Sequence, residues 1–156
     1  MNEIYIISSL SESENISILR SKNIEQSKIA YRQKVWFNME ESKNKLREET
    51  IEFAISVSDM CENIKGCSVY VNQLIRSSSS IGANIHEAKY AQSRADFINK
   101  LEIALKECYE TEYWLELLFR KNKIDNITYK NLNNKCGTIR RKLIASVTTA
   151  KKNSGQ

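Results

Sequence analysis

The sequence contains no proline and only four glycines among its 156 residues. Folds made only of β-strands depend on both residue types at their turns, so this composition argues against that class. The helix formers Glu, Lys, Leu, Ala and Arg are frequent instead. The chain is long enough for one domain that buries its own core. These features together predict an all-α protein.

Histidine and cysteine are too few, or wrongly spaced, for a metal centre. His86 is the only histidine, whereas a ferritin-like di-iron site takes a Glu-x-x-His motif from each of two helices. Cys61, Cys67, Cys108 and Cys136 show neither CxxC spacing nor a pairing with histidine. We therefore expect no metal and no cofactor, and free, mostly buried thiols in a reducing cytoplasm.

The motifs of common enzyme classes and of membrane segments are also missing. The serines at 77–80 lack a glycine-framed nucleophile elbow, and the chain has neither a phosphate-binding glycine loop nor a dinucleotide fingerprint. Nowhere do 18 consecutive apolar residues occur, and no basic segment followed by an apolar run opens the chain. We expect a non-enzyme that stays in the cytoplasm without contacting a membrane.

Apolar or small residues recur at steps of three and four in four segments, which predicts four amphipathic helices. The first begins at Leu46, the second spans about 69–92, the third about 94–122, and the fourth follows a turn at 123–127. The predicted core positions are Leu46, Thr50, Phe53, Val57, Met60, Ile64, Leu74, Ser78, Ile81, Ile85, Ala88, Phe97, Leu101, Ala104, Cys108, Thr111, Leu115, Leu118, Tyr129, Leu132, Cys136, Ile139, Leu143 and Val147. The short connections predict an antiparallel up-down-up-down four-helix bundle with a poorly defined N-terminal extension.

Capping residues mark where these helices begin and end. Gly66 is expected in the left-handed conformation after the first helix, with Ser68 as the cap of the second. Ser93 is expected to cap the third helix, with Asp96 in its first turn. The cap of the fourth helix is either Asn126 or Thr128.

The chain divides into an extension at 1–44, the bundle at 45–152 and a tail at 153–156. The extension is rich in Ser, Asn and Ile without a sustained helical period, which predicts weak structure: a short strand at Ile4–Ile7 and a helix at Ile24–Phe37. Met39 could equally start the polar lead into the first bundle helix. We therefore expect the first 38 residues to be dispensable, or to arise from an upstream start codon.

The second and third helices carry more apolar residues than one bundle core can face. The additional residues are Ile75, Tyr90, Ile98, Leu105, Tyr109, Tyr113, Trp114, Leu117 and Phe119. Such a second apolar surface predicts a homo-oligomer, the alternative being a monomer with scattered surface aromatics.

A family resemblance rests on three stretches: Gln73–Ser78, then Ser80–Ile85 with Glu87-Ala88, then Arg94–Ile98. Ala104–Glu107, Glu110-Thr111 and Tyr113–Leu115 complete it. From Leu46 to about Lys152 the chain resembles the four-helix-bundle family of intervening-sequence proteins encoded inside large-subunit ribosomal RNA genes. That family also includes the accessory variability determinant of diversity-generating retroelements. The resemblance implies a non-enzymatic protein, often a homopentamer, with a basic surface for nucleic acid and, in the retroelement branch, for a reverse transcriptase.

The residues after Asp125 support nucleic-acid binding independently. No acidic residue follows it, and seven cations do: Lys130, Lys135, Arg140, Arg141, Lys142, Lys151 and Lys152. Because Arg140, Arg141 and Lys142 are consecutive, they spread around the helix and cannot all face the core. The sequence therefore predicts a cationic outer face for the phosphate backbone of RNA or DNA. The alternative is a solvated helix whose last lysines complement the dipole.

A second group of residues is predicted to serve helix packing or oligomer contacts. It comprises Arg76, Ser77, Ser80, Asn84, Glu87, Tyr113 and Trp114. The small serines allow a close helix crossing, while the amide of Asn84 needs a partner, for which the facing candidates are Lys106, Glu107 and Glu110. Arg76 could answer an acid of a neighbouring protomer or join the basic face.

Three functions therefore remain open. The first is a nucleic-acid-binding oligomer, either an rRNA intervening-sequence protein or an accessory to a reverse transcriptase. The second is an adaptor that binds another protein through its apolar surface without nucleic acid. The third is a small enzyme, which the missing motifs disfavour.

Overall fold

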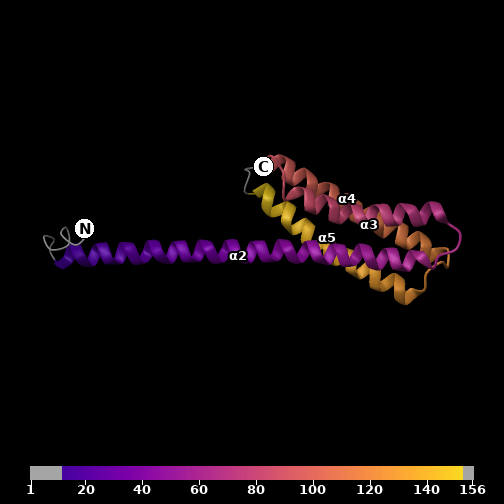
Figure 1. Cartoon of the computed structure of the whole chain (residues 1–156), viewed down its shortest axis with the longest axis horizontal. Helices are drawn as coiled ribbons and strands as arrows, with labels where there is room; N and C mark the ends of the chain where they lie inside the picture. The colour runs from indigo at the N-terminus through magenta and orange to yellow at the C-terminus, as the bar shows by residue number, and fades with distance from the viewer. Residues whose placement is uncertain (1–11, 153–156) are drawn as a thin grey trace. The chain divides into compact units, whose positions relative to one another are not determined.

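The computed structural model describes residues 12–152, and all regular secondary structure in this range is helical. Figure 1 shows the four helices, α2 (Glu12–Glu62), α3 (Ser68–Ala88), α4 (Arg94–Arg120) and α5 (Asn126–Lys152). The prediction of an all-α protein is thus confirmed for these residues. The strand expected at Ile4–Ile7 and the tail at 153–156 lie outside them.

Helix α2 belongs to two structural units, Met1–Lys43 and Asn44–Gln156. The sequence placed the start of the first bundle helix at Leu46, and this was wrong, because α2 already begins at Glu12. Residues 38–45 contain neither proline nor glycine and are rich in Glu and Lys. They include no helix-breaking residue, so the helix continues through them. The helix expected at 24–37 is therefore one part of a longer helix.

The core of the second unit consists of the positions that the helical period predicted. Most of them are buried; six are only half-buried, namely Leu46, Met60, Ile64, Ile85, Phe97 and Tyr129. Besides the thiol of Cys61, the predicted core positions omit five buried residues, which are Ser77, Ile98, Ile124, Gly137 and Ala150. Three of these five are small or polar, so a search for apolar periodicity could not find them.

Helices α3 and α4 lie side by side (Figure 1). Arg76 of α3 pairs with Glu110 of α4, with 2.5 Å between nitrogen and oxygen. Further along α3, Glu87 pairs with Lys100 at the same distance, near the beginning of α4. The contacts therefore follow opposite orders along the two helices.

Helices α4 and α5 show the same reversed order of contacts. Near the start of α4, the Arg94 guanidinium donates to the Ala150 carbonyl of α5 at 3.1 Å. At the end of α4, the Phe119 ring stacks on Tyr129 in the first turns of α5, with ring centroids 4.5 Å apart. Arg94 thereby satisfies one of the carbonyl groups that the end of a helix leaves unpaired.

Helices α2 and α3 lie close together where Gly82 faces Thr50. A Cβ atom at Gly82 would lie 3.1 Å from the Thr50 hydroxyl oxygen, tighter than ordinary van der Waals contact. That hydroxyl donates to the Arg47 carbonyl at 2.7 Å, which fixes its rotamer. The small residues of α3 thus admit the neighbouring helix, as the sequence predicted for this stretch.

The turn before α3 confirms one predicted cap and corrects another. Gly66 has φ +75°, as expected for a residue after a helix end. Ser68, however, is the first residue of α3 and caps nothing; the N-cap position belongs to Cys67, whose φ is also positive, at 60°. The Cys67 side chain makes no capping hydrogen bond to the first turn of α3.

The cap of α4 is confirmed. The Ser93 hydroxyl oxygen accepts a hydrogen bond from the Asp96 amide at 3.1 Å. In return, the Asp96 carboxylate accepts from the Gln92 amide, also at 3.1 Å. This exchange satisfies two backbone donors at the beginning of the helix.

Candidate nucleic-acid interface

Helix α5 carries all seven of the cations that the sequence assigned to nucleic acid. Its cap is Asp125, whose carboxylate accepts from the Thr128 amide and the Thr128 hydroxyl, both at 2.8 Å. The expected caps Asn126 and Thr128 were therefore wrong, because the aspartate one position earlier accepts both bonds. These bonds, the backbone one first, lower the pKa of Asp125 below its ordinary value.

Three of the seven cations are paired with acids of other helices. Arg140 pairs with Glu112 of α4 at 2.9 Å, and its pKa is raised chiefly by this hydrogen bond. Lys142 and Lys151 pair with Glu49 of α2 and Glu102 of α4, at 2.5 and 2.7 Å. The absence of acids after Asp125 therefore overstates the free charge of α5, since neighbouring helices supply the counter-charges.

Arg140 also contacts an aromatic ring that the sequence did not link to it. Its guanidinium carbon lies 5.3 Å from the centroid of the Tyr109 ring of α4. Between this ring and Glu112 the guanidinium is held at the border of α4 and α5. Such a contact is a cation–π interaction, which fixes the orientation of both side chains.

The other four cations form no ion pair with any acid within residues 12–152. Lys130, Arg141 and Lys152 are exposed and lie at intervals of eleven residues. Eleven residues correspond to about three helical turns, so the three share one side of α5 and are spaced by about 16.5 Å. Arg141 donates only to the neutral hydroxyl of Thr138, at 3.0 Å. We call Lys130, Arg141 and Lys152 the outer row.

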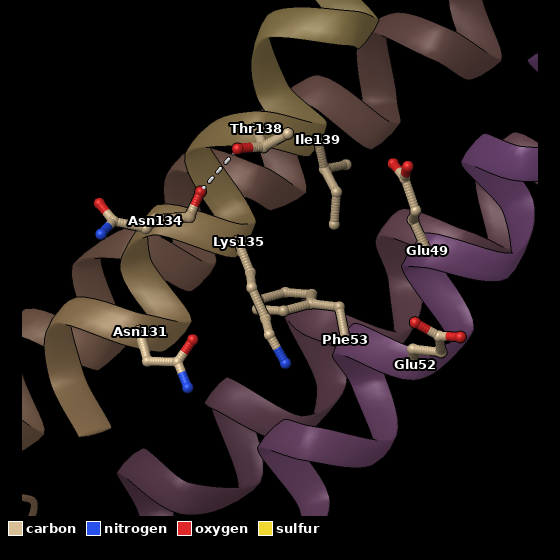
Figure 2. Close-up of a pocket in the computed structure, with 8 residues that line it drawn as sticks. All are labelled: Glu49, Glu52, Phe53, Asn131, Asn134, Lys135, Thr138 and Ile139. Carbon is tan, nitrogen blue, oxygen red and sulfur yellow. Dashed lines mark hydrogen bonds between the residues drawn. The ribbon is translucent and has the colours of Figure 1, made fainter. Parts of the chain in front are cut away.

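Lys135 differs from the outer row because it borders a groove between α2 and α5. Its ammonium nitrogen lies 3.4 Å from the Ser56 hydroxyl. Figure 2 shows the groove, which has a volume of about 300 Å³ and is lined by Glu49, Glu52, Phe53, Asn131, Asn134, Lys135, Thr138 and Ile139. Its two carboxylates make it an unfavourable place for a phosphate group.

The residues predicted for packing or oligomer contacts find their partners inside the chain. Arg76 pairs with Glu110 and, at 3.9 Å, with Glu107 of the same chain. Ser77 is buried and accepts from the Thr111 hydroxyl at 3.0 Å. Its role in the contact of α3 with α4 is the packing role that the small residues predicted.

Asn84 corrects a second expectation. Its amide donates to the carbonyl and the hydroxyl of Ser80, at 2.9 and 3.2 Å, one turn earlier in α3. The proposed partners Lys106, Glu107 and Glu110 were therefore wrong. A bond within one helix needs no facing residue, and sequence spacing alone could not exclude it.

Trp114 of α4 takes part in the packing of α4 against α3. Its indole nitrogen donates to the Glu110 carboxylate at 3.1 Å. Its ring stacks on Tyr70 of α3, with centroids 6.0 Å apart, and lies edge-on to Tyr113 at 5.0 Å. Trp114 is thus largely occupied within the chain, whereas Tyr113 is exposed.

The second apolar surface is smaller than the sequence indicated. Ile98 is buried, and five of the nine residues are half-buried: Ile75, Leu105, Trp114, Leu117 and Phe119. Only Tyr90, Tyr109 and Tyr113 are exposed. Burial by α3, α4 and α5 accounts for the rest, because helices that pack against two neighbours need an apolar arc wider than one stripe.

The remaining titratable groups give no sign of a metal site. No group of three or more His, Cys, Asp or Glu side chains in residues 12–152 could hold an ion. All four cysteines are free thiols. Burial raises the pKa of Cys61 to about 11, so this thiol stays protonated near neutral pH.

None of the helices within residues 12–152 has the length and apolar character of a bilayer-spanning segment.

Comparison with known proteins now adds the family. The profile of the 23S rRNA-intervening sequence proteins matches residues 42–145. A protein of unknown function from Bacteroides thetaiotaomicron, a member of the S23 ribosomal protein family, has a crystal structure that superposes on this chain with a TM-score of 0.65. The two sequences are 45% identical. The match covers 68% of this chain and 97% of that one. No curated protein sequence matches. The chain therefore belongs to the 23S rRNA-intervening sequence protein family.

Proposed function

We propose that the protein is a non-enzymatic nucleic-acid-binding protein and that the outer row of α5 is its principal phosphate-binding surface. The observation that carries this proposal is that Lys130, Arg141 and Lys152 share one side of a helix and have no acidic partner within residues 12–152. A cation already paired with a carboxylate must lose that partner before it binds phosphate. The cations of the outer row have no such partner to lose within residues 12–152, and each contact with phosphate releases counterions from the nucleic acid.

Binding through this row should depend on charge more than on base sequence. Lysine and arginine contacts to phosphate fix position without reading bases. The outer row offers one ammonium or guanidinium group about every 16.5 Å. Selectivity would then come from the fold of the RNA or from a partner protein.

The experiment neutralises the outer row and compares it with a matched control. Lys130→Gln, Arg141→Gln and Lys152→Gln together remove three charges from one side of α5. The control, Lys34→Gln, Lys45→Gln and Lys65→Gln, removes three exposed charges that have no ion pair within residues 12–152 and lie outside α5. Both variants have the same net charge, so a difference between them reports position.

We expect the outer-row variant to bind RNA and DNA more weakly at low salt, and the control to bind nearly as the wild type does. The slope of log affinity against log salt should fall by about 2 to 3, since each lost phosphate contact contributes about 0.7 to 0.9. Equal losses in the two variants would show a non-specific charge effect, and no loss in the outer-row variant would remove α5 as the interface.

The arrangement of the second unit is proposed to be the antiparallel up-down-up-down four-helix bundle. The reversed order of contacts between α3 and α4, and between α4 and α5, supports this topology. Lys142 with Glu49 and Lys135 with Ser56 show the same reversed order between α5 and α2.

Self-association, with five copies as the family resemblance implies, is a further part of the proposal. The exposed Ile51 and Ile55, one turn apart on α2, support it, because adjacent isoleucines in water favour burial against another surface. Sedimentation equilibrium of the wild type and of Ile51→Ser with Ile55→Ser tests it. A monomeric wild type would contradict self-association and leave the phosphate surface to be judged by its own variants.

The biological setting is proposed as the cytoplasm, where the four thiols would stay reduced. A reverse transcriptase is a proposed partner only if its gene lies beside this one, whereas a location inside a ribosomal RNA gene favours the intervening-sequence branch.

The adaptor alternative predicts a protein complex that survives nuclease and high salt. Such a complex, found without nucleic-acid binding, would overturn the proposal.

A further inference from the structure

Two tyrosines of α4 expose their rings on the side of the helix that turns away from the core. Tyr109 is 51% exposed and Tyr113 is 58% exposed. Residues four apart on a helix are neighbours, with about 5–6 Å between their Cβ atoms. Arg140 lies over one ring and Trp114 lies edge-on to the other, so both rings are held in place. We call Tyr109 and Tyr113 the tyrosine pair.

The acids around the tyrosine pair all lie close to cations, although Arg76 is shared by Glu107 and Glu110. Helix α4 carries five glutamates from residue 102 to residue 116, and each lies within 4.0 Å of a lysine or arginine nitrogen. These glutamates are Glu102, Glu107, Glu110, Glu112 and Glu116. Four cations therefore balance most of their charge locally, and this side of α4 repels a polyanion less than its composition suggests.

Unpaired cations flank the same rings. Lys106 is exposed, lies one turn before Tyr109, and has no ion pair within residues 12–152. On the neighbouring helix, Arg141 of the outer row directly follows the Arg140 that covers Tyr109. The same helix and its neighbour thus carry both exposed rings and exposed cations without an ion pair within residues 12–152, the two components that single-strand-binding surfaces combine.

We propose that the tyrosine pair stacks on the bases of a single-stranded segment of nucleic acid whose phosphates contact Lys106 and Arg141. This inference rests on the proposed function and adds the form of the ligand, an unpaired stretch. A base within a duplex is covered on both faces by its neighbours. An exposed tyrosine ring can therefore stack only on bases that are unpaired, such as those of loops, bulges and ends.

The test replaces both rings in the full chain by leucine, as Tyr109→Leu with Tyr113→Leu. Leucine keeps an apolar side chain and favours the helix, but it offers no ring for stacking. The matched control is Tyr90→Leu, which removes a ring that is 73% exposed and lies outside α4. The probes are a labelled single-stranded RNA of mixed sequence and a labelled RNA duplex of equal phosphate number.

We expect the double variant to lose affinity for the single strand by about 5-fold or more for each ring, the lower end of what base stacking contributes. Its affinity for the duplex and its salt slope should be unchanged, and the control should behave as the wild type does. Equal affinity of the double variant and the wild type for the single strand would overturn the inference. So would a changed sedimentation mass with unchanged affinity, because the rings would then serve contacts between protein copies.

A second measurement separates this inference from the proposed function. Free adenosine has no phosphate, so its binding does not depend on the outer row. We expect adenosine at high concentration to shift the NMR ring-proton signals of Tyr109 and Tyr113, and not those of Tyr90. If the wild type bound neither RNA probe, the proposed function would fail, while the adenosine shifts would still support or overturn stacking by this pair.

Discussion

At the scale of single residues, Glu110 of α4 is bonded to both α3 and its own helix. Its carboxylate accepts from the Trp114 indole at 3.1 Å and from the Arg76 guanidinium at 2.5 Å. These partners, the indole first and the guanidinium second, hold the pKa of Glu110 below its ordinary value of 4.5. The folded state thus favours the ionised carboxylate.

The lowered pKa of Glu110 predicts a pH dependence of stability. In acid the unfolded state binds the proton more readily, so the free energy of unfolding falls as pH falls. The stabilising effect is complete above the ordinary carboxyl pKa and is lost as pH falls through the folded value. Urea unfolding of the wild type and Glu110→Gln should therefore differ most near pH 6 and least near pH 3. A constant difference across this range would contradict the role of the ionised carboxylate.

Gly82 and Gly137 provide a matched pair of helical glycines for a second prediction. A Cβ at Gly137 would meet its nearest neighbour, the flexible end of Arg141, at an ordinary 3.6 Å. At Gly82 the neighbour is the buried Thr50, 3.1 Å away. Gly137→Ala should stabilise the protein by about 0.5–1 kcal/mol through helix propensity, and Gly82→Ala should gain less or destabilise. Denaturant midpoints measure both, and a larger gain at Gly82 would show that α2 yields easily.

At the scale of elements, the chemistry of the helix ends was harder to predict than the helices themselves. Apolar period located α3, α4 and α5 to within about four residues at either end. The caps were harder to predict. Ser68 for α3, and Asn126 or Thr128 for α5, are all good capping residue types, but the backbone conformation decides which residue occupies the cap position. Ser93 was predictable since its partner Asp96 stands at the right spacing in the same stretch.

Two serines test this account of the helix ends. Ser93→Ala removes the hydroxyl that accepts from the first turn of α4 and should cost about 0.5–2 kcal/mol of unfolding free energy. Ser68→Ala changes a serine that begins α3 without capping it, so it should cost much less. Thermal or urea unfolding measures the difference. Equal costs would mean that Ser68 also stabilises its helix end.

At the scale of the whole molecule, the sequence predicted which helix carries the cations but not which cations are free. Three of the seven cations are neutralised by ion pairs: Arg140 with Glu112, Lys142 with Glu49, and Lys151 with Glu102. Each of these acids is adjacent to a core residue, a position that places it at the border with the next helix. Pairing across such borders depends on helix rotation, which a single sequence does not determine.

Removal of the first 38 residues tests whether the second unit folds without them. The core cluster of that unit runs from Leu46 to Val147, so a chain beginning at Met39 keeps all of it. Its melting temperature should lie within about 4 °C of the full-length value, the shift expected for about 1 kcal/mol in a chain of this size. A chain beginning at Ile51 is the control: it lacks the buried Thr50 and the packed Leu46, and it should melt well below both. If the Met39 chain melted as low as this control, the boundary between Lys43 and Asn44 would not separate independent folding units, and residues before it would have to stabilise the core.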